Sequence, residues 1–296
     1  MNLYDELLRQ IERTIELRSD KPDETFESTL RSLWWTAAGW PRSPIWASVG
    51  PLPTLSESQT DEARALVQRR LSGVPLCYLT RRQRFLGLEM HAAPGALIPR
   101  KETEVLGRAA LSLIRDRIER HGTARIVDVC TGSGNLALAY ASHQPRARVH
   151  AADLSADAIR VAEINASMMG LAGAVDFRVG DLAAPFAELA GQVDVLSCNP
   201  PYISTGKLRA LPAEIADHEP ALAFDGGPFG INILRRLTTE GAAMVRPGGW
   251  MCLEVGLGQG PAVAQRLSAC GLYGDIRTYA DGQGAIRALA AQVREQ

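Results

Sequence analysis

The sequence predicts an α/β fold in which a mostly parallel sheet is covered by helices on both faces, preceded by a small all-helical region. From residue 125 onward, short apolar stretches alternate with helical periodicities, which is the pattern of strands joined by crossover helices. Residues 1–75 show helical periodicity and no strand pattern. The chain of 296 residues is 46% hydrophobic and 22% charged, which is typical of a globular protein with a core.

Three helices are expected in the helical domain, residues 1–75. Residues 3–18 place leucines and isoleucines on one face, and a second helix runs from near Glu24 to Gly39. Residues 40–53 contain several prolines and predict a loop or short helical turns. A third helix begins with the capping box Ser56-Glu57-Ser58-Gln59. This domain is either structural or a site that docks the substrate.

Residues 76–100 are interpreted as a linker. The apolar stretches 85–90 and 96–99 predict a hairpin that joins two domains. Six arginines surround the last helix and the linker, namely Arg64, Arg69, Arg70, Arg81, Arg82 and Arg84. They form either a solvated face or a contact with an acidic or phosphate-bearing partner.

Residues 101–296 are expected to form the larger domain. Its seven strands are expected at 125–129, 148–153, 175–179, 193–198, 250–255, 274–279 and 285–290. Helices are expected from residue 100 to about 114 and at 135–143, 155–169, 229–245 and 259–270. The last two strands leave no room for a helix between them and so form a hairpin. Seven strands with a late hairpin favour a Rossmann-like methyltransferase sheet over a dehydrogenase sheet.

A tight glycine turn follows the first strand of this sheet. Thr131-Gly132-Ser133-Gly134 lies between the strand and a helix that begins at Asn135. Open α/β sheets bind ligands at the carboxyl ends of their strands, and glycines there let a ligand approach the backbone. The turn matches neither G-x-G-x-x-G nor G-K-[ST], so a dinucleotide or phosphate cradle is not indicated.

Three aspartates accompany this turn in a fixed order. Asp153 ends the second strand, where a carboxylate can accept both hydroxyls of a ribose, although alone it could be structural. Asp128 in the first strand is predicted either to orient the loop or to bind the amino group of the methionine portion of a cofactor. Asp181 is predicted to bind an adenine amine. The set predicts S-adenosylmethionine as cofactor. Its predicted contacts are Asp128, Thr131, Gly132, Gly134, Asp153, Asp181 and Asn199.

The stretch Asn199-Pro200-Pro201-Tyr202 follows the buried strand 193–198 and can hold a planar nitrogen group. The Asn199 side chain offers a carbonyl acceptor, and Pro200 presents its C=O without a neighbouring N–H. Tyr202 offers a face for stacking. We therefore predict Asn199, Pro200 and Tyr202 as catalytic, and the whole stretch as substrate-binding. The alternative is a strand followed by an ordinary proline-rich turn.

With this motif on the fourth strand, the chain resembles the HemK-type N5-glutamine methyltransferases. The resemblance covers most of the chain. It includes Pro75-Leu76-Cys77-Tyr78-Leu79-Thr80, Pro94-Gly95-Ala96-Leu97-Ile98-Pro99-Arg100, the glycine turn, Asn199-Pro200-Pro201-Tyr202-Ile203, the stretch 218–227, and Asp281, Gly284 and Arg287. The family usually has glycine where Cys130 stands, and it differs from this chain at Arg81, Arg84 and Lys101.

The resemblance implies that the chain methylates the side-chain amide of the glutamine in the Gly-Gly-Gln loop of peptide-chain release factors. It also implies the roles given above for Asn199, Pro200 and Tyr202. Two alternatives stay open: a methyltransferase with the same pockets that acts on a small-molecule amine or amide or on a nucleobase amine, and a cofactor-binding scaffold without activity. Transfer of labelled methyl to release factor, nucleic acid or metabolites would distinguish them.

Net charge, cysteine spacing and the lengths of apolar runs exclude several classes of protein. The net charge of −1 argues against a strongly electrostatic nucleic-acid binder. The five cysteines form no C-x-x-C pair, so we expect reduced thiols and no metal. The first residues do not resemble a signal peptide and no apolar run approaches a membrane span, so the expected location is the cytoplasm.

Overall fold

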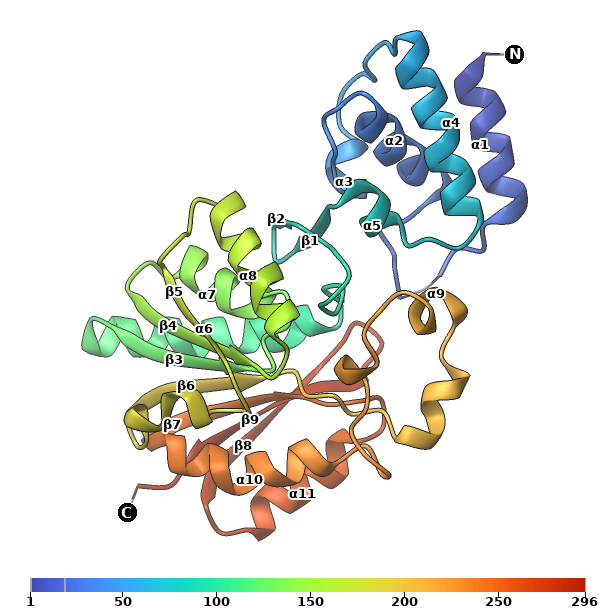
Figure 1. Cartoon of the computed structure of the whole chain (residues 1–296). Helices are drawn as coiled ribbons and strands as arrows, with labels where there is room; N and C mark the ends of the chain where they lie inside the picture. The colour runs from blue at the N-terminus through green and yellow to red at the C-terminus, as the bar shows by residue number, and fades with distance from the viewer. Residues whose placement is uncertain (1, 19, 296) are drawn as a thin grey trace.

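A computed structural model describes residues 2–18 and 20–295 of the chain. Four helices come first, α1 (Leu3–Thr14), α2 (Phe26–Ala37), α3 (Pro44–Ala47) and α4 (Glu57–Leu71), and they lie together at one end of the molecule (Figure 1). They enclose a core of their own that includes Leu7, Leu33 and Leu66. The predicted capping box is present, because Ser56 and Gln59 exchange hydrogen bonds at the start of α4. The 1–75 boundary itself stays a prediction.

The linker contains the predicted hairpin in a shorter form. Strands β1 (Gln83–Phe85) and β2 (Leu88–Met90) pair antiparallel, after a short helix α5 (Leu76–Thr80) that the sequence did not indicate. The apolar stretch 96–99, which we expected in the hairpin, forms no strand. Instead Ala96 packs on Ala158 and Val161, and the Ile98 N–H donates to Glu219. Packing against the larger domain therefore replaces strand pairing there.

The sheet of the larger domain has seven strands in the order β5-β4-β3-β6-β7-β9-β8. They are β3 (Ala124–Val129), β4 (Ala147–Asp153), β5 (Val175–Val179), β6 (Val193–Cys198), β7 (Val245–Glu254), β8 (Tyr273–Ala280) and β9 (Ile286–Val293). Strands β3 to β7 pair parallel, whereas β9 pairs antiparallel with both β7 and β8. The predicted strands and the late hairpin are confirmed.

Helices cover both faces of this sheet (Figure 1). They are α6 (Thr103–His121), α7 (Asn135–His143) and α8 (Ala156–Met168) on one face, and α10 (Asn232–Met244) and α11 (Gly260–Ala269) on the other. Each face buries a separate core: Leu106 and Tyr140 lie in the first, and Leu237 and Leu267 in the second. Within the described residues, no helix has the length and apolarity that crossing a membrane requires.

The chain between β6 and α10 leaves the sheet and extends toward the N-terminal helices (Figure 1). It contains the short helix α9 (Ala213–Ala216) and two 3-10 helices, η2 (Thr205–Ala210) and η3 (Ala221–Ala223). Glu214 in α9 accepts from Lys21 at 2.6 Å and lies 3.6 Å from Arg70. These ion pairs are partly buried, so they tie the segment after Asn199 to the helical region.

Candidate active site

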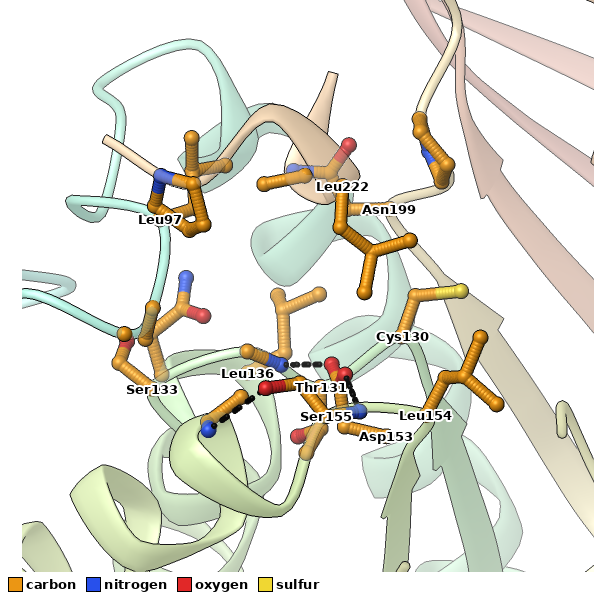
Figure 2. Close-up of a pocket in the computed structure, with 18 of the residues that line it drawn as sticks. Leu97, Cys130, Thr131, Ser133, Leu136, Asp153, Leu154, Ser155, Asn199 and Leu222 are labelled. Atoms are coloured by element: carbon orange, nitrogen blue, oxygen red, sulfur yellow. Dashed lines mark hydrogen bonds between the residues drawn. The ribbon is translucent and has the colours of Figure 1, made fainter. Parts of the chain in front are cut away.

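A cavity opens at the carboxyl ends of β3, β4 and β6 and encloses about 1070 Å³, part of it continuous with solvent. Three residues of the glycine turn line it, namely Thr131, Gly132 and Ser133, whereas Gly134 does not. Asp153, Asp181, Asn199 and Pro201 also line it, together with Thr103, Leu97 and Leu222. Figure 2 shows Asn199 on the opposite side of the cavity from Asp153. The structure thus brings together the two ends of the predicted site.

The glycine turn forms the floor of the cavity. Gly132 and Gly134 have φ angles of +56° and +76°, which glycine adopts without steric cost. A Cβ on Gly134 would lie 2.9 Å from the Cβ of Ala162, so glycine is also required for α7 and α8 to approach each other. Cys130 has a φ angle of 56°, where a side chain is unfavourable. This φ angle favours glycine at position 130.

Asp153 sits at the end of β4 and faces the cavity. Its Oδ2 accepts from the Gly132 N–H at 2.8 Å and its Oδ1 accepts from the Ser155 N–H at 2.9 Å (Figure 2). Burial raises the pKa of this carboxyl, while the two backbone donors oppose the rise. Each oxygen keeps a second lone pair for a ligand hydroxyl.

Asp128 lies beneath the cavity and does not line it. Its two oxygens accept from the hydroxyls of Thr131 at 2.6 Å and Ser197 at 2.5 Å, and the residue is fully buried. Burial raises the pKa of Asp128 to about 7, against the effect of these two donors. Of the two roles considered for Asp128, these contacts match orientation of the loop, because Thr131 is the first residue of the turn.

Asp181 reaches the cavity from the loop after β5. Its carboxylate accepts from Arg236 of α10 at 3.0 Å and is half-exposed. The ion pair places Asp181 at the rim between the two helical layers. Its predicted contact with an adenine amine stays a prediction.

Asn199 follows β6 and lines the cavity together with Pro201. Its Nδ2 donates to the Thr103 hydroxyl at 3.2 Å, which leaves Oδ1 as the side-chain atom that can accept from a ligand. Pro200 is buried, and Tyr202 turns away so that its hydroxyl donates to Glu254 at 3.1 Å. The stacking role of Tyr202 and the acceptor role of the Pro200 carbonyl stay predictions, and in this structure neither residue lines the cavity.

The segment 218–227 packs against this motif. The Ile203 N–H donates to the Phe224 carbonyl, and the Gly226 N–H donates to the Ile203 carbonyl. A Cβ on Gly226 would lie 2.7 Å from the Pro201 carbonyl oxygen. Glu219 in the same segment is buried, accepts from the Ile98 N–H at 3.0 Å and pairs with Arg100. The stretches 94–100 and 218–227 therefore meet beside the cavity.

Sequence reasoning missed three polar residues of the site. Thr103 and Glu254 are each 1% exposed and lie next to Asn199 and Tyr202. Asn165 of α8 is also buried, where its amide bonds His91 of the linker and Ser133 of the glycine turn. Each of these residues is a polar residue within an apolar pattern, which could have marked it as unusual. That pattern does not indicate which side chains it contacts.

Three of the six arginines of the cluster lie within 4.0 Å of a carboxylate of the chain. Arg64 binds Glu6 at 2.6 Å, Arg70 lies near Glu24, and Arg82 lies 4.0 Å from Glu89. All five cysteines are free thiols, and Cys77, Cys198 and Cys252 are buried. Among residues 2–18 and 20–295, no group of His, Cys, Asp or Glu side chains is arranged to hold a metal ion.

A family model and the curated relatives of this chain all describe methyltransferases. The family described as a methyltransferase small domain matches residues 108–251. The release factor glutamine methyltransferase of Moorella thermoacetica is 42% identical over 78% of this chain and 79% of its own length. That of Gloeobacter violaceus is 37% identical over 79% of this chain and 80% of its own length.

Solved structures share the fold. The catalytic domain of hMettl16, in complex with an RNA hairpin, superposes with a TM-score of 0.55 at 14% identity, covering 81% of this chain and 84% of that one. The N-terminal domain of human METTL16 in complex with SAH gives 0.50 at 17% identity, over 71% of this chain and 77% of that one. At such identities the likeness concerns the fold.

Proposed function

The chain belongs to the release factor glutamine methyltransferase family, and from this premise we propose that it methylates the side-chain amide nitrogen of a glutamine in a peptide-chain release factor. The methyl donor of this family is S-adenosylmethionine. The glutamine of a Gly-Gly-Gln loop is the proposed acceptor. The observation that carries the proposal is the position of Asn199, whose Nδ2 is held by Thr103 while the residue lines the cavity of the glycine turn.

The cavity fits the cofactor on three features of the structure. Gly132 leaves the floor without a side chain, and Asp153 presents two oxygens that each accept one backbone N–H. Asp181 stands at the rim. We propose that Asp153 binds the ribose hydroxyls, that Asp181 binds the adenine amine, and that Asp128 acts through Thr131. When bound, the cofactor would supply an electrophilic methyl group from its sulfonium. Transfer breaks the S–CH₃ bond and leaves a neutral thioether, and the amide nitrogen releases one of its two protons.

The chain's own contribution is to hold a weak nucleophile. An amide nitrogen shares its lone pair with the carbonyl, so its position matters more than a strong base. In the proposal, Asn199 Oδ1 and the Pro200 carbonyl accept the two N–H bonds of the glutamine amide. Both acceptors interact more strongly as positive charge develops on the nitrogen, which is the differential stabilisation that catalysis requires.

The mouth of the cavity suits a substrate presented on a protein loop. Leu222 lines the cavity and is 52% exposed, so an apolar surface continues from the site to solvent. The segment that carries it is tied to the N-terminal helices through Glu214 and Lys21. A protein that inserts one side chain into the cavity could therefore contact both regions at once.

The test is transfer of labelled methyl from S-adenosylmethionine to purified release factor, with tRNA, DNA and a metabolite extract as alternative acceptors. The expected result is transfer to the release factor, lost when its loop glutamine is replaced by alanine. Transfer only to nucleic acid or to a metabolite would contradict the proposed substrate. Cofactor binding without any transfer would indicate a scaffold.

A further inference from the structure

A buried carboxylate stands next to the amide-binding residues without a role in the proposed mechanism. Glu254 is the last residue of β7, and Asn199 directly follows β6. The pairing of Cys198 with Leu253 in the parallel ladder places Asn199 and Glu254 side by side. Glu254 is 1% exposed, and its Oε2 has no hydrogen-bond partner within the described part of the chain. Burial of an ionised carboxylate is costly unless hydrogen bonds or an opposite charge compensate it, and Oε2 lacks such a hydrogen bond in that part of the chain.

Glu254 lies between the motif and Thr103. Its Oε1 accepts from the Tyr202 hydroxyl at 3.1 Å, and Thr103 lies near enough to lower the pKa of the carboxyl. The Thr103 hydroxyl accepts from Asn199 Nδ2 at 3.2 Å, so its own hydrogen is left for another acceptor, and Glu254 Oε2 is an acceptor for which the described residues provide no donor. An ionised carboxylate only accepts hydrogen bonds. Beside an ionised Glu254, the single hydroxyl hydrogen of Thr103 is attracted to the carboxylate, and the Thr103 oxygen is then the atom that accepts from Asn199. This order of donors determines which end of the Asn199 amide faces Thr103.

We propose that Glu254 is a positioning residue whose negative charge, relayed by the Thr103 hydroxyl, holds the Asn199 side chain with Oδ1 available to the substrate amide. The proposal rests on the function assigned above to Asn199. Protonated Glu254 can donate to Thr103, whose hydrogen can then turn to Asn199. The Asn199 amide is then no longer restricted to one orientation, and its NH₂ group would meet the N–H bonds of the substrate.

The surroundings of Glu254 place its protonation near neutral pH. Burial raises the pKa of Glu254 to about 7, and the charge of Glu102 raises it further. Thr103, Tyr202 and the charge of Arg287 on β9 act in the opposite direction. Since the ionised form is the competent one, turnover is expected to fall as the pH drops through about 7. The Tyr202 hydroxyl stays neutral in this range, because burial and Glu254 raise its pKa.

The first experiment measures kcat and KM for release factor methylation in three variants. Glu254→Gln removes the charge at nearly constant shape, and Thr103→Val removes the hydroxyl. Each should lower kcat roughly 10- to 100-fold, the scale for a hydrogen bond to a charged group, with unchanged S-adenosylmethionine affinity by calorimetry. Thr103→Ser retains the hydroxyl and should recover most of the kcat that Thr103→Val loses. The wild-type fall in kcat below neutral pH should be absent in Glu254→Gln.

The second experiment needs no methyl acceptor. The side-chain NH₂ signal of Asn199, assigned by its absence in Asn199→Asp, should shift with pH around neutrality in the wild type and stay constant in Glu254→Gln. A wild-type enzyme that does not methylate release factor would refute the proposed function, yet the NMR result would still decide the role of Glu254. Glu254→Gln with wild-type kcat and pH profile, or a pH-independent Asn199 signal in the wild type, would overturn the inference. If Glu254→Gln does not fold, the comparison of Thr103→Val with Thr103→Ser and the pH dependence of the wild-type Asn199 signal still test the role of Glu254.

Discussion

The two sides of the cavity are built differently. On the cofactor side, the contacts join residues close in sequence: Thr131 bonds Asp128, Ser155 bonds Asp153, and Gly132 bonds Asp153 across 21 residues. On the amide side, Asn199 bonds Thr103 across 96 residues and Tyr202 bonds Glu254 across 52. The cofactor side is thus one βαβ unit, whereas the amide side is assembled from α6, β6 and β7.

The difference separates two kinds of function. Backbone N–H groups and glycines in a turn adopt their geometry locally, so they can hold a cofactor without precise distant contacts. Side chains that position a reacting nitrogen need their own orientation determined by other side chains. Substitutions on the amide side should therefore change turnover, while those on the cofactor side should change affinity or stability.

The largest effect is expected for Asn199→Ala. Removal of an acceptor that acts on developing charge should lower kcat on the order of 10²-fold or more. Affinity for S-adenosylmethionine, measured by calorimetry, should stay nearly intact because the cofactor is held mainly by the opposite side. Normal turnover in this variant would refute the role of Asn199 and the division between the two sides.

The reverse pattern is expected for Asp153→Ala. This variant removes the proposed ribose acceptor and the partner of the Gly132 N–H, so S-adenosylmethionine should bind roughly 10- to 100-fold more weakly. Once the cofactor is saturating, kcat should recover substantially. Unchanged affinity by calorimetry would exclude the ribose role. Asp176→Ala, a surface carboxylate on β5 paired with Arg178, serves as a control.

The pH dependence of stability should report the buried Asp128. Its pKa is raised from 3.8 to about 7, so the folded chain retains this proton more tightly than the unfolded chain. The contribution of Asp128 is therefore most favourable below about pH 4 and is lost as the pH rises to about 7, by at most about 1.4 kcal/mol per pH unit.

Urea unfolding of Asp128→Asn should show a flatter pH profile than the wild type over this window, since Asn does not ionise. Glu254 contributes in the same direction in both proteins, because its pKa is also raised. An identical slope in the two proteins would show that Asp128 is already ionised in the folded state at low pH.

The smallest effect is expected at Cys130, whose φ angle of 56° favours glycine. Cys130→Gly should be more stable than Cys130→Ala by about 1 kcal/mol, because both lack the thiol but only alanine retains the unfavourable Cβ. The comparison is made by urea unfolding. Equal stabilities would mean that the backbone there relaxes, and that the cofactor side is less rigid than its hydrogen bonds indicate.

Much of the fold could be read from local patterns. The seven strands, the late hairpin and the glycine turn were predicted because apolar periodicity and glycine placement depend on neighbouring residues. The second half of the linker hairpin was wrong for the same reason: the stretch 96–99 is apolar enough for a strand, but it packs on α8 and Glu219 instead. A short apolar run does not specify what it will be buried against.

Short-range patterns were enough to predict the glycine turn and the aspartates near it, since these residues follow their strands at fixed short distances. The motif with Asn199 could be predicted in the same way. The orientation of Asn199 and the presence of Glu254 and Thr103 beside it came from the tertiary structure, because Glu254 and Thr103 sit inside ordinary apolar patterns. The physical reason is that a hydrogen bond between buried side chains depends on which distant strands and helices meet, and sheet order and register are set by the packing of the whole domain.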